Sequence, residues 1–232
     1  MNRLVNILRQ SFPFCMELVR AQAFLLALLF AAGTLLGTSI EGAMRGLGPS
    51  EQDSRWMFQL SLGIWDLIEG LLLILILSRG VTQVDNLSPE WFEPKPFSKP
   101  FLSSFLAEYL RMLAQVLLWG LLLLIPGFVR YGRLAFVPLI AIFSRAYREG
   151  QADALELSAE LSRGRMWVIL TVIFLTSVSQ AGLEFLPQMY MSLYVLPVRV
   201  GFTAVSFLIS VWTYSFLFLL FEQAVREKRY HE

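Results

Sequence analysis

Two pairs of ionisable residues lie inside long apolar stretches and are the first candidates for chemistry. Asp66 and Glu69 are three residues apart in one stretch, and Glu108 and Arg111 have the same spacing in the next. Residues three apart share a face of an α-helix. Ionisable groups are costly in the hydrocarbon region and usually pair or mark a path for protons or substrates. We therefore treat these four residues as a candidate intramembrane polar cluster.

The same two pairs also have a plainer interpretation. By position along the chain, Asp66 and Glu69 fall near mid-membrane, whereas Glu108 and Arg111 fall closer to the cytoplasmic boundary. The two pairs therefore need not meet. A salt link between Glu108 and Arg111 that fixes helix packing is the favoured alternative to a functional path.

Arginines near the ends of apolar stretches are candidates for contacts with lipid phosphates. Ordinary positive-inside anchoring explains those on the cytoplasmic side more simply. Arg133 is different, because it is expected on the side that normally lacks arginine. The candidates are Arg130 and Arg133 at the outer boundary and Arg145, Arg148, Arg163 and Arg165 on the cytoplasmic side.

A polar segment after these stretches predicts a short amphipathic helix over 151–162 on the cytoplasmic side. Its acids suit the start of a helix, where the helix dipole is positive, and leucines four apart form one apolar face. Gly164 is a predicted left-handed cap. This helix is either a connector or a docking face for a protein partner, with the candidate contacts Asp153, Glu156, Leu157, Glu160 and Leu161.

Several classes of chemistry are poorly supported. The single Cys15 cannot form an intramolecular disulfide, and the single His231 leaves no imidazole cluster for a metal. No nucleophile with a histidine base and no glycine-rich phosphate loop is recognisable. The net charge of +1 gives no strong field for nucleic acid. We therefore expect no enzyme activity, no metal, no cofactor and no nucleic-acid partner.

Composition predicts an all-α, polytopic membrane protein with a single membrane domain over 1–232. Hydrophobic residues make up 56% of the chain and charged residues only 16%, which is too few charges for an ordinary soluble domain. We expect an interfacial amphipathic lead-in over 1–20 and about six crossings. The predicted crossings are 21–40, 57–78, 104–125, 128–147, 166–185 and 198–221.

Proline marks two breaks in this plan. Pro126-Gly127 is predicted to end the third crossing, because proline removes a backbone donor and glycine permits a tight reversal. Pro138 should bend the fourth crossing. The uncharged part of that crossing, 134–144, is short, so 128–147 is either shielded by neighbouring helices or partly re-entrant.

Loop charges predict the orientation. Assigning Lys and Arg to alternate sides places 13 on one side and 5 on the other, and the richer side is cytoplasmic by the positive-inside rule. We therefore expect a multi-pass protein of the cytoplasmic (inner) membrane with both termini in the cytoplasm.

One part of the chain resembles a known family. The residues that carry the resemblance are Pro126, Gly127, Arg133, Pro138, Ala154, Leu155, Ser158, Leu161, Gly164 and Trp167. This pattern is similar to that of bacterial and archaeal six-helix membrane proteins related to the glycerophosphodiester phosphodiesterase membrane domain and to the YciC-type inner-membrane proteins. The family often has an acid at the end of the fourth helix, where this chain has Phe143 and Ser144. The resemblance implies an arrangement of helices and no catalytic residue.

Two functions follow as hypotheses. The first is a non-enzymatic structural or accessory subunit of a membrane assembly, with membrane lipids and either a protein partner or further copies of itself as contacts. The second is a transporter of small molecules or lipids, or a lipid-handling protein, with a polar path at Asp66 and Glu69. The first is the sequence-based preference, because no inverted repeat is evident.

Overall fold

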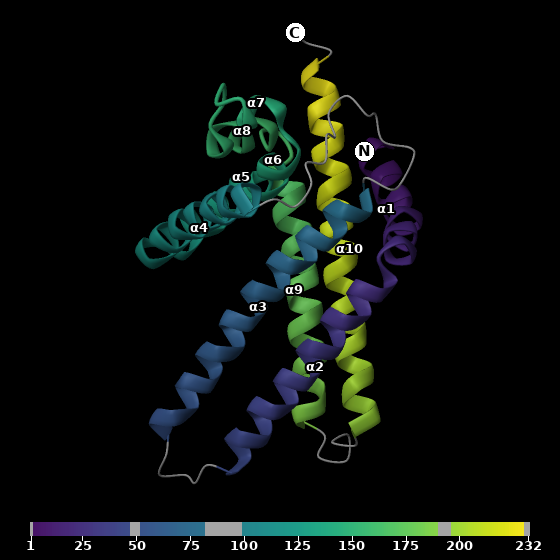
Figure 1. Ribbon diagram of the computed structural model, residues 1–232, viewed down its shortest axis with the longest axis vertical. Helices are drawn as coiled ribbons and strands as arrows, with labels where there is room; N and C mark the ends of the chain where they lie inside the picture. The colour runs from purple at the N-terminus through teal and green to yellow at the C-terminus, as the bar shows by residue number, and fades with distance from the viewer. Residues whose placement is uncertain (1, 47–51, 82–98, 190–195, 230–232) are drawn as a thin grey trace.

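The computed structural model describes residues 2–46, 52–81, 99–189 and 196–229, and its regular elements over these ranges are all α-helices (Figure 1). This confirms the predicted all-α class. The helices are α1 (Asn2–Ala21), α2 (Ala23–Gly46), α3 (Gln52–Val81), α4 (Lys99–Leu122), α5 (Leu124–Leu134), α6 (Val137–Phe143), α7 (Arg145–Arg148), α8 (Ala154–Leu161), α9 (Met166–Met189) and α10 (Leu196–Arg229).

Several described helices are long and apolar enough to cross a membrane. Four segments meet this requirement: Leu102–Leu122, Ile125–Phe143, Met166–Leu183 and Val200–Glu227. A fifth is possible if α1 and α2, which meet at 87°, together form one broken span. The described part of the chain therefore supports a multi-pass membrane protein with four or five such segments. The structure does not describe the side chains of several α3 residues, among them Asp66.

The N-terminal helix packs on the protein as well as presenting a free face. Its buried face runs along Ile7, Ser11, Cys15 and Leu18, at the three- and four-residue spacing of one side of a helix. The indole Nε1 of Trp212 in α10 donates to Ser11 Oγ at 3.1 Å. The free face includes Phe12, which is 66% exposed.

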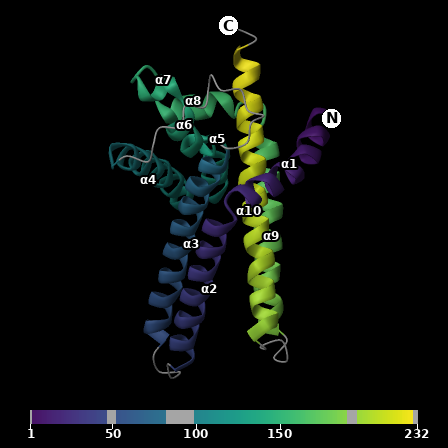
Figure 2. The same ribbon diagram turned by 45° about the vertical axis from the view of Figure 1, so that its right-hand side comes forward.

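The α4–α5 hairpin is inclined to α9 and α10 and projects to one side of them (Figure 1 and Figure 2). The reversal comes earlier than predicted, because α4 ends at Leu122 and Leu123 is extended. Pro126 lies in the first turn of α5, where a backbone N–H has no helical partner to lose. A Cβ on Gly127 would lie 2.6 Å from Gly120 Cα. Gly127 therefore allows the two helix backbones to touch just after the turn.

A break separates α5 from α6, as Pro138 predicted. Pro138 lies at the first turn of α6, and the helix backbone is interrupted at Ala135 and Phe136. All seven residues of α6 are buried. Phe136 packs against Phe221 of α10 with ring centroids 5.6 Å apart, so this short helix anchors the hairpin to the core.

Residues 144–162 form a small polar cap on α5, α6 and α10. Ser144 caps α7, and Asp153 caps α8 by accepting from the backbone N–H groups of Leu155 and Glu156. Gly164 has φ of 82°, which confirms the predicted left-handed cap. The helix predicted over 151–162 is the shorter α8.

The position of Arg133 corrects one part of the predicted topology. Its backbone oxygen accepts hydrogen bonds from Ser158 Oγ at 2.9 Å and Ser162 Oγ at 3.1 Å. Arg133 and α8 therefore lie on the same side of the molecule, and the expectation of opposite membrane faces is wrong. The reason is that α5 is a short helix returning to the cap. Ten residues separate Leu123 from Arg133, a rise of only about 15 Å.

Candidate functional site

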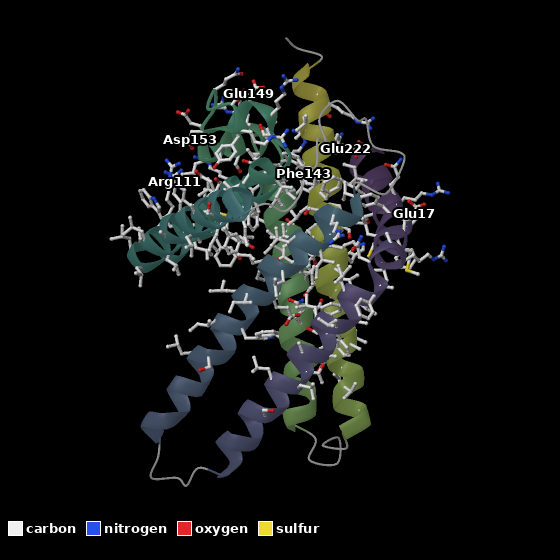
Figure 3. The ribbon with its side chains drawn as sticks, in the orientation of Figure 1. Glu17, Arg111, Phe143, Glu149, Asp153 and Glu222 are labelled. Carbon is white, nitrogen blue, oxygen red and sulfur yellow. The ribbon has the colours of Figure 1, made fainter. Side chains whose placement is uncertain are left out.

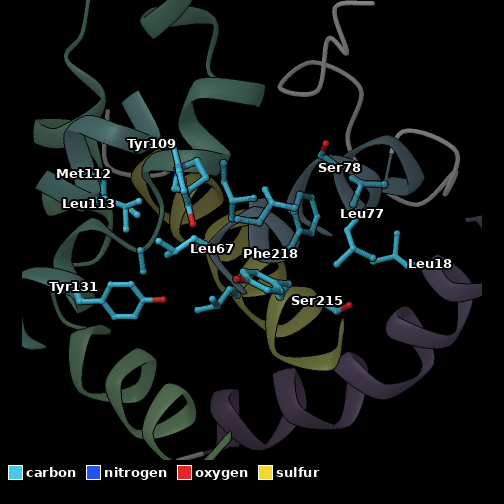
Figure 4. A pocket seen from close by; sticks show the side chains of 18 residues that line it. Leu18, Leu67, Leu77, Ser78, Tyr109, Met112, Leu113, Tyr131, Ser215 and Phe218 are labelled. Atoms are coloured by element: carbon cyan, nitrogen blue, oxygen red, sulfur yellow. The ribbon is translucent and has the colours of Figure 1, made fainter. Parts of the chain in front are cut away.

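A cavity of about 160 Å³ lies where α1, α3, α4, α5, α6 and α10 meet (Figure 4). Most of its wall is aliphatic and aromatic, and none of the described residues that line it is charged. Leu67 of α3 lines the cavity and is also 46% exposed. Leu67 therefore marks a point where the cavity wall reaches the outer surface of the helices.

Three tyrosines from different helices bring hydroxyl groups to this apolar space. They are Tyr109 of α4, Tyr131 of α5 and Tyr214 of α10. The hydroxyls of Tyr109 and Tyr131 point into the cavity (Figure 4). Tyr109 is only 8% exposed, and Tyr131 and Tyr214 are half-buried. No hydrogen bond joins any of these three hydroxyls to another residue in the described part of the chain.

The other hydroxyls of the cavity are already used. Ser78 Oγ donates to the Leu75 carbonyl at 2.8 Å, and Ser215 Oγ donates to the Val211 carbonyl at 2.7 Å. The tyrosines therefore supply the donors that remain for a guest. These hydroxyls border the open space of the cavity, where each can donate to an acceptor oxygen on a guest.

Beside the cavity, Arg111 of α4 holds the cap. Arg111 Nη1 donates to Asp153 Oδ2 at 2.7 Å and lies 3.6 Å from Glu108 Oε2. Tyr147 Oη donates to Glu108 Oε1 at 3.3 Å. We call these four residues the clasp. Figure 3 shows Arg111 and Asp153 facing each other between α4 and α8.

The clasp changes the pKa of Asp153 and of Tyr147, its two residues that belong to the cap. Burial alone would raise the pKa of Asp153, but hydrogen bonds from Arg111 and from the backbone of Leu155 and Glu156 hold it below its ordinary value. Burial raises the pKa of Tyr147, and the neighbouring Glu108 carboxylate raises it further. Asp153 is therefore an ionised carboxylate at neutral pH, and Tyr147 a neutral donor.

The predicted polar cluster is divided in the structure. Glu108 and Arg111 belong to the clasp, whereas Glu69 Oε2 accepts from Trp65 Nε1 at 3.1 Å on its own helix. Glu69 also faces α2, since a Cβ on Gly33 would lie 3.3 Å from its carboxylate. The side chain of Asp66 lies outside the description. Glu69 adjoins Gly70, which lines the cavity.

Several predicted phosphate-binding arginines are engaged within the protein. Arg130 lies over the ring of Trp119, 5.7 Å from its centroid. Arg145 pairs with Glu149 at 2.6 Å, and Arg165 pairs with Glu227 of α10. Arg148 is partly buried and also interacts with another residue. The remaining candidates are the exposed side chains of Arg133 and Arg163.

The apolar face of the predicted docking helix packs against the protein core. Leu161 is 6% exposed and belongs to the protein core, Leu157 packs against that core, and Asp153 is held in the clasp. Glu156 and Glu160 remain on the exposed side. A partner could reach these acids, but not the buried leucine without displacing α8.

The described ranges contain no group of three His, Cys, Asp or Glu side chains that could hold a metal ion. Comparison of the chain with protein-family models, with curated proteins and with solved structures finds no match. The resemblance noted from the sequence therefore stays an expectation.

Sequence reasoning did not identify the cavity tyrosines. They are far apart in the chain, at positions 109, 131 and 214, and each stands in an apolar helix where a tyrosine usually indicates packing. The available signal was weak: a hydroxyl in an apolar stretch normally finds a partner.

Proposed function

We propose that the protein is a non-enzymatic membrane protein that takes a lipid-soluble molecule from the bilayer into the cavity between α1, α3, α4, α5, α6 and α10. The cavity carries the proposal: it is mostly apolar, uncharged along its described lining, and bordered by three tyrosines whose hydroxyls form no hydrogen bond to a described residue. Ligand sites of this kind are mostly apolar with a few placed polar groups.

The surroundings of the cavity favour a guest that arrives from lipid. The outer faces of α3 and α4 carry exposed leucines and isoleucines, among them Leu60, Ile64, Leu106 and Leu110. Lipid would cover such faces, and Leu67 joins the exposed face of α3 to the cavity wall. Entry between helices from the membrane requires no aqueous path.

The inclined α4–α5 hairpin supports a re-entrant arrangement. Its tip carries exposed large apolar side chains, including Leu121, Leu122, Leu123 and Ile125, whereas Arg133 returns to the polar cap. A tip about 15 Å from that residue does not traverse about 30 Å of hydrocarbon. In this proposal the hairpin dips into one leaflet and α4 forms one wall of the cavity, while the cap lies on the cytoplasmic side.

The accessory-subunit hypothesis has less support from the geometry. Of its expected contacts on the 151–162 helix, Leu161 is buried in the core and Asp153 is held in the clasp, whereas Glu156 and Glu160 stay exposed. The transport hypothesis, with its polar path at Asp66 and Glu69, keeps partial support. Leu67 and Gly70, which lie on either side of Glu69 in the chain, line the cavity.

Photolabelling with a diazirine-bearing long-chain alcohol tests the proposal in membranes. We expect labelling of α4 around Leu113, which lines the cavity, and its reduction in Ala135→Leu, which adds side-chain volume there. Ala181→Leu, on the exposed surface of α9, is the matched control and should keep the labelling. Label spread evenly over lipid-facing helices, with no response to Ala135→Leu, would contradict the proposal.

A further inference from the structure

The tyrosine cavity also restricts the kind of molecule that it accepts. We propose that it binds the ring of a neutral, lipid-soluble carbonyl compound, of the quinone or aromatic-ketone class, whose oxygens accept hydrogen bonds from the tyrosine hydroxyls. This inference rests on the proposed function and deepens it, because it names the chemistry of the guest.

Size favours a ring over an extended chain alone. The cavity encloses about 160 Å³, and apolar protein cavities of about 150 Å³ accommodate benzene. A substituted six-membered ring fills such a space, while an attached tail could leave past Leu67, where the lining reaches the outer surface.

Charge excludes an anionic head group from this space. None of the described lining residues is Lys or Arg, and Arg111 is committed to Asp153 and Glu108 in the clasp. A phosphate or carboxylate without a cationic partner would be strongly penalised in an apolar cavity. The guest is therefore neutral.

The hydroxyl positions allow hydrogen bonds to acceptor oxygens on the guest. Tyr109 is more than nine-tenths buried and points into the cavity with Tyr131 (Figure 4), and Gly70 is the neighbour that lets Tyr214 approach, since a Cβ there would lie 2.9 Å from the Tyr214 hydroxyl. A carbonyl oxygen has two lone pairs and can accept from two of these groups. Carbonyls on a ring therefore satisfy donors that come from different helices.

Equilibrium dialysis of the full-length protein in detergent, corrected for empty micelles, tests this assignment. The probes are tetramethyl-para-benzoquinone and tetramethylbenzene, which share ring and methyl groups and differ in the two carbonyls. We expect the wild-type protein to retain the quinone at least about tenfold more tightly. A variant that loses a hydrogen bond to the quinone should weaken quinone binding about fivefold and leave the binding of tetramethylbenzene unchanged. The variants to compare are Tyr109→Phe, Tyr131→Phe and Tyr214→Phe. Tyr147→Phe removes a hydroxyl outside the cavity and should alter neither.

The outcomes separate this inference from the proposed function. Equal retention of both probes, lost in Ala135→Leu but unaffected by the tyrosine variants, would overturn the carbonyl assignment and leave an apolar binding cavity. Retention of neither probe above empty micelles, in a protein that still takes up the diazirine alcohol, would also overturn it. Quinone binding unaffected by all of these variants would place the guest elsewhere and count against both.

Discussion

Arg111 and Asp153, separated by 42 positions in the chain, form a 2.7 Å hydrogen-bonded ion pair that ties α4 to the N-cap residue of α8. Asp153 also caps α8 through its other carboxylate oxygen. One side chain thus fixes both the start of the cap helix and its attachment to the cavity wall.

We predict that Asp153→Ala lowers the free energy of unfolding by about 1–2 kcal/mol, because it removes the helix cap and the ion pair together. Asp153→Asn keeps a capping oxygen and should cost less, about 0.5–1 kcal/mol. Thermal unfolding of both variants in detergent measures the difference. Equal losses in the two variants would show that the cap contributes nothing beyond the charge.

The same pair predicts a pH dependence. The folded pKa of Asp153 lies below its ordinary value of 3.8, so its contribution to stability is fully present above that value and is lost as the pH falls through the folded pKa. The stability difference between Asp153→Asn and wild type should therefore persist near pH 4 and shrink as the pH falls through the folded pKa of Asp153. A gap between the two proteins that stays constant down to pH 2 would contradict the assignment.

Gly127 should be intolerant of even one methyl group. A Cβ at this position would lie 2.6 Å from Gly120 Cα, so Gly127→Ala must separate two helix backbones, at a cost of about 1–3 kcal/mol. The reciprocal change Gly120→Ala is the control, since its Cβ would meet nothing within 4 Å, and alanine is the better helix former. We expect a lower melting temperature for Gly127→Ala than for Gly120→Ala. Equal melting temperatures would mean that the two helix backbones do not touch at Gly127.

Part of this architecture was predictable, because it depends on local sequence. The fifth apolar segment was expected over 166–185, and α9 spans Met166–Met189. Gly164 has the positive φ that favours glycine, and Pro138 lies in the first turn of α6, where proline is tolerated. The reversal at Leu123 was predicted a few residues too late, since proline in a first helical turn does not end a helix.

The long-range relationships were not predictable in the same way. In an apolar helix most positions are hydrophobic, so the pattern does not reveal which face meets which neighbour. Arg111 was therefore paired only with Glu108, its neighbour on the same helix, although its shorter contact is with Asp153. Arg133 was placed away from α8 for a related reason: no local pattern shows that its backbone oxygen accepts from Ser158 and Ser162.

Two serines share one acceptor, and their variants should not be additive. Ser158 and Ser162 are both fully buried and both donate to the Arg133 carbonyl. Either single change to alanine leaves that oxygen with one donor and should cost about 1 kcal/mol or less, whereas the double variant leaves it without either and should cost more than the sum. A double-variant cycle by chemical denaturation measures the coupling, and strict additivity would contradict a shared acceptor.

Cysteine accessibility tests the re-entrant hairpin. In a Cys15→Ser background, Leu123→Cys should react with a membrane-impermeant maleimide from neither side, because the tip lies within the bilayer. Glu149→Cys and Glu160→Cys, at exposed positions of the cap, should both react from the same side. Reaction of Leu123→Cys from the side opposite to the cap would instead establish two full crossings.

The most direct test of the central claim is native mass spectrometry of the protein released from its own host membrane in a mild detergent, comparing wild type with Ala135→Leu and Ala181→Leu. Binding in the cavity predicts a defined neutral small-molecule adduct on the wild-type and Ala181→Leu proteins that is depleted in Ala135→Leu. A bare protein in all three, or a stoichiometric protein adduct with no small molecule, would contradict the account and favour a subunit of a larger assembly.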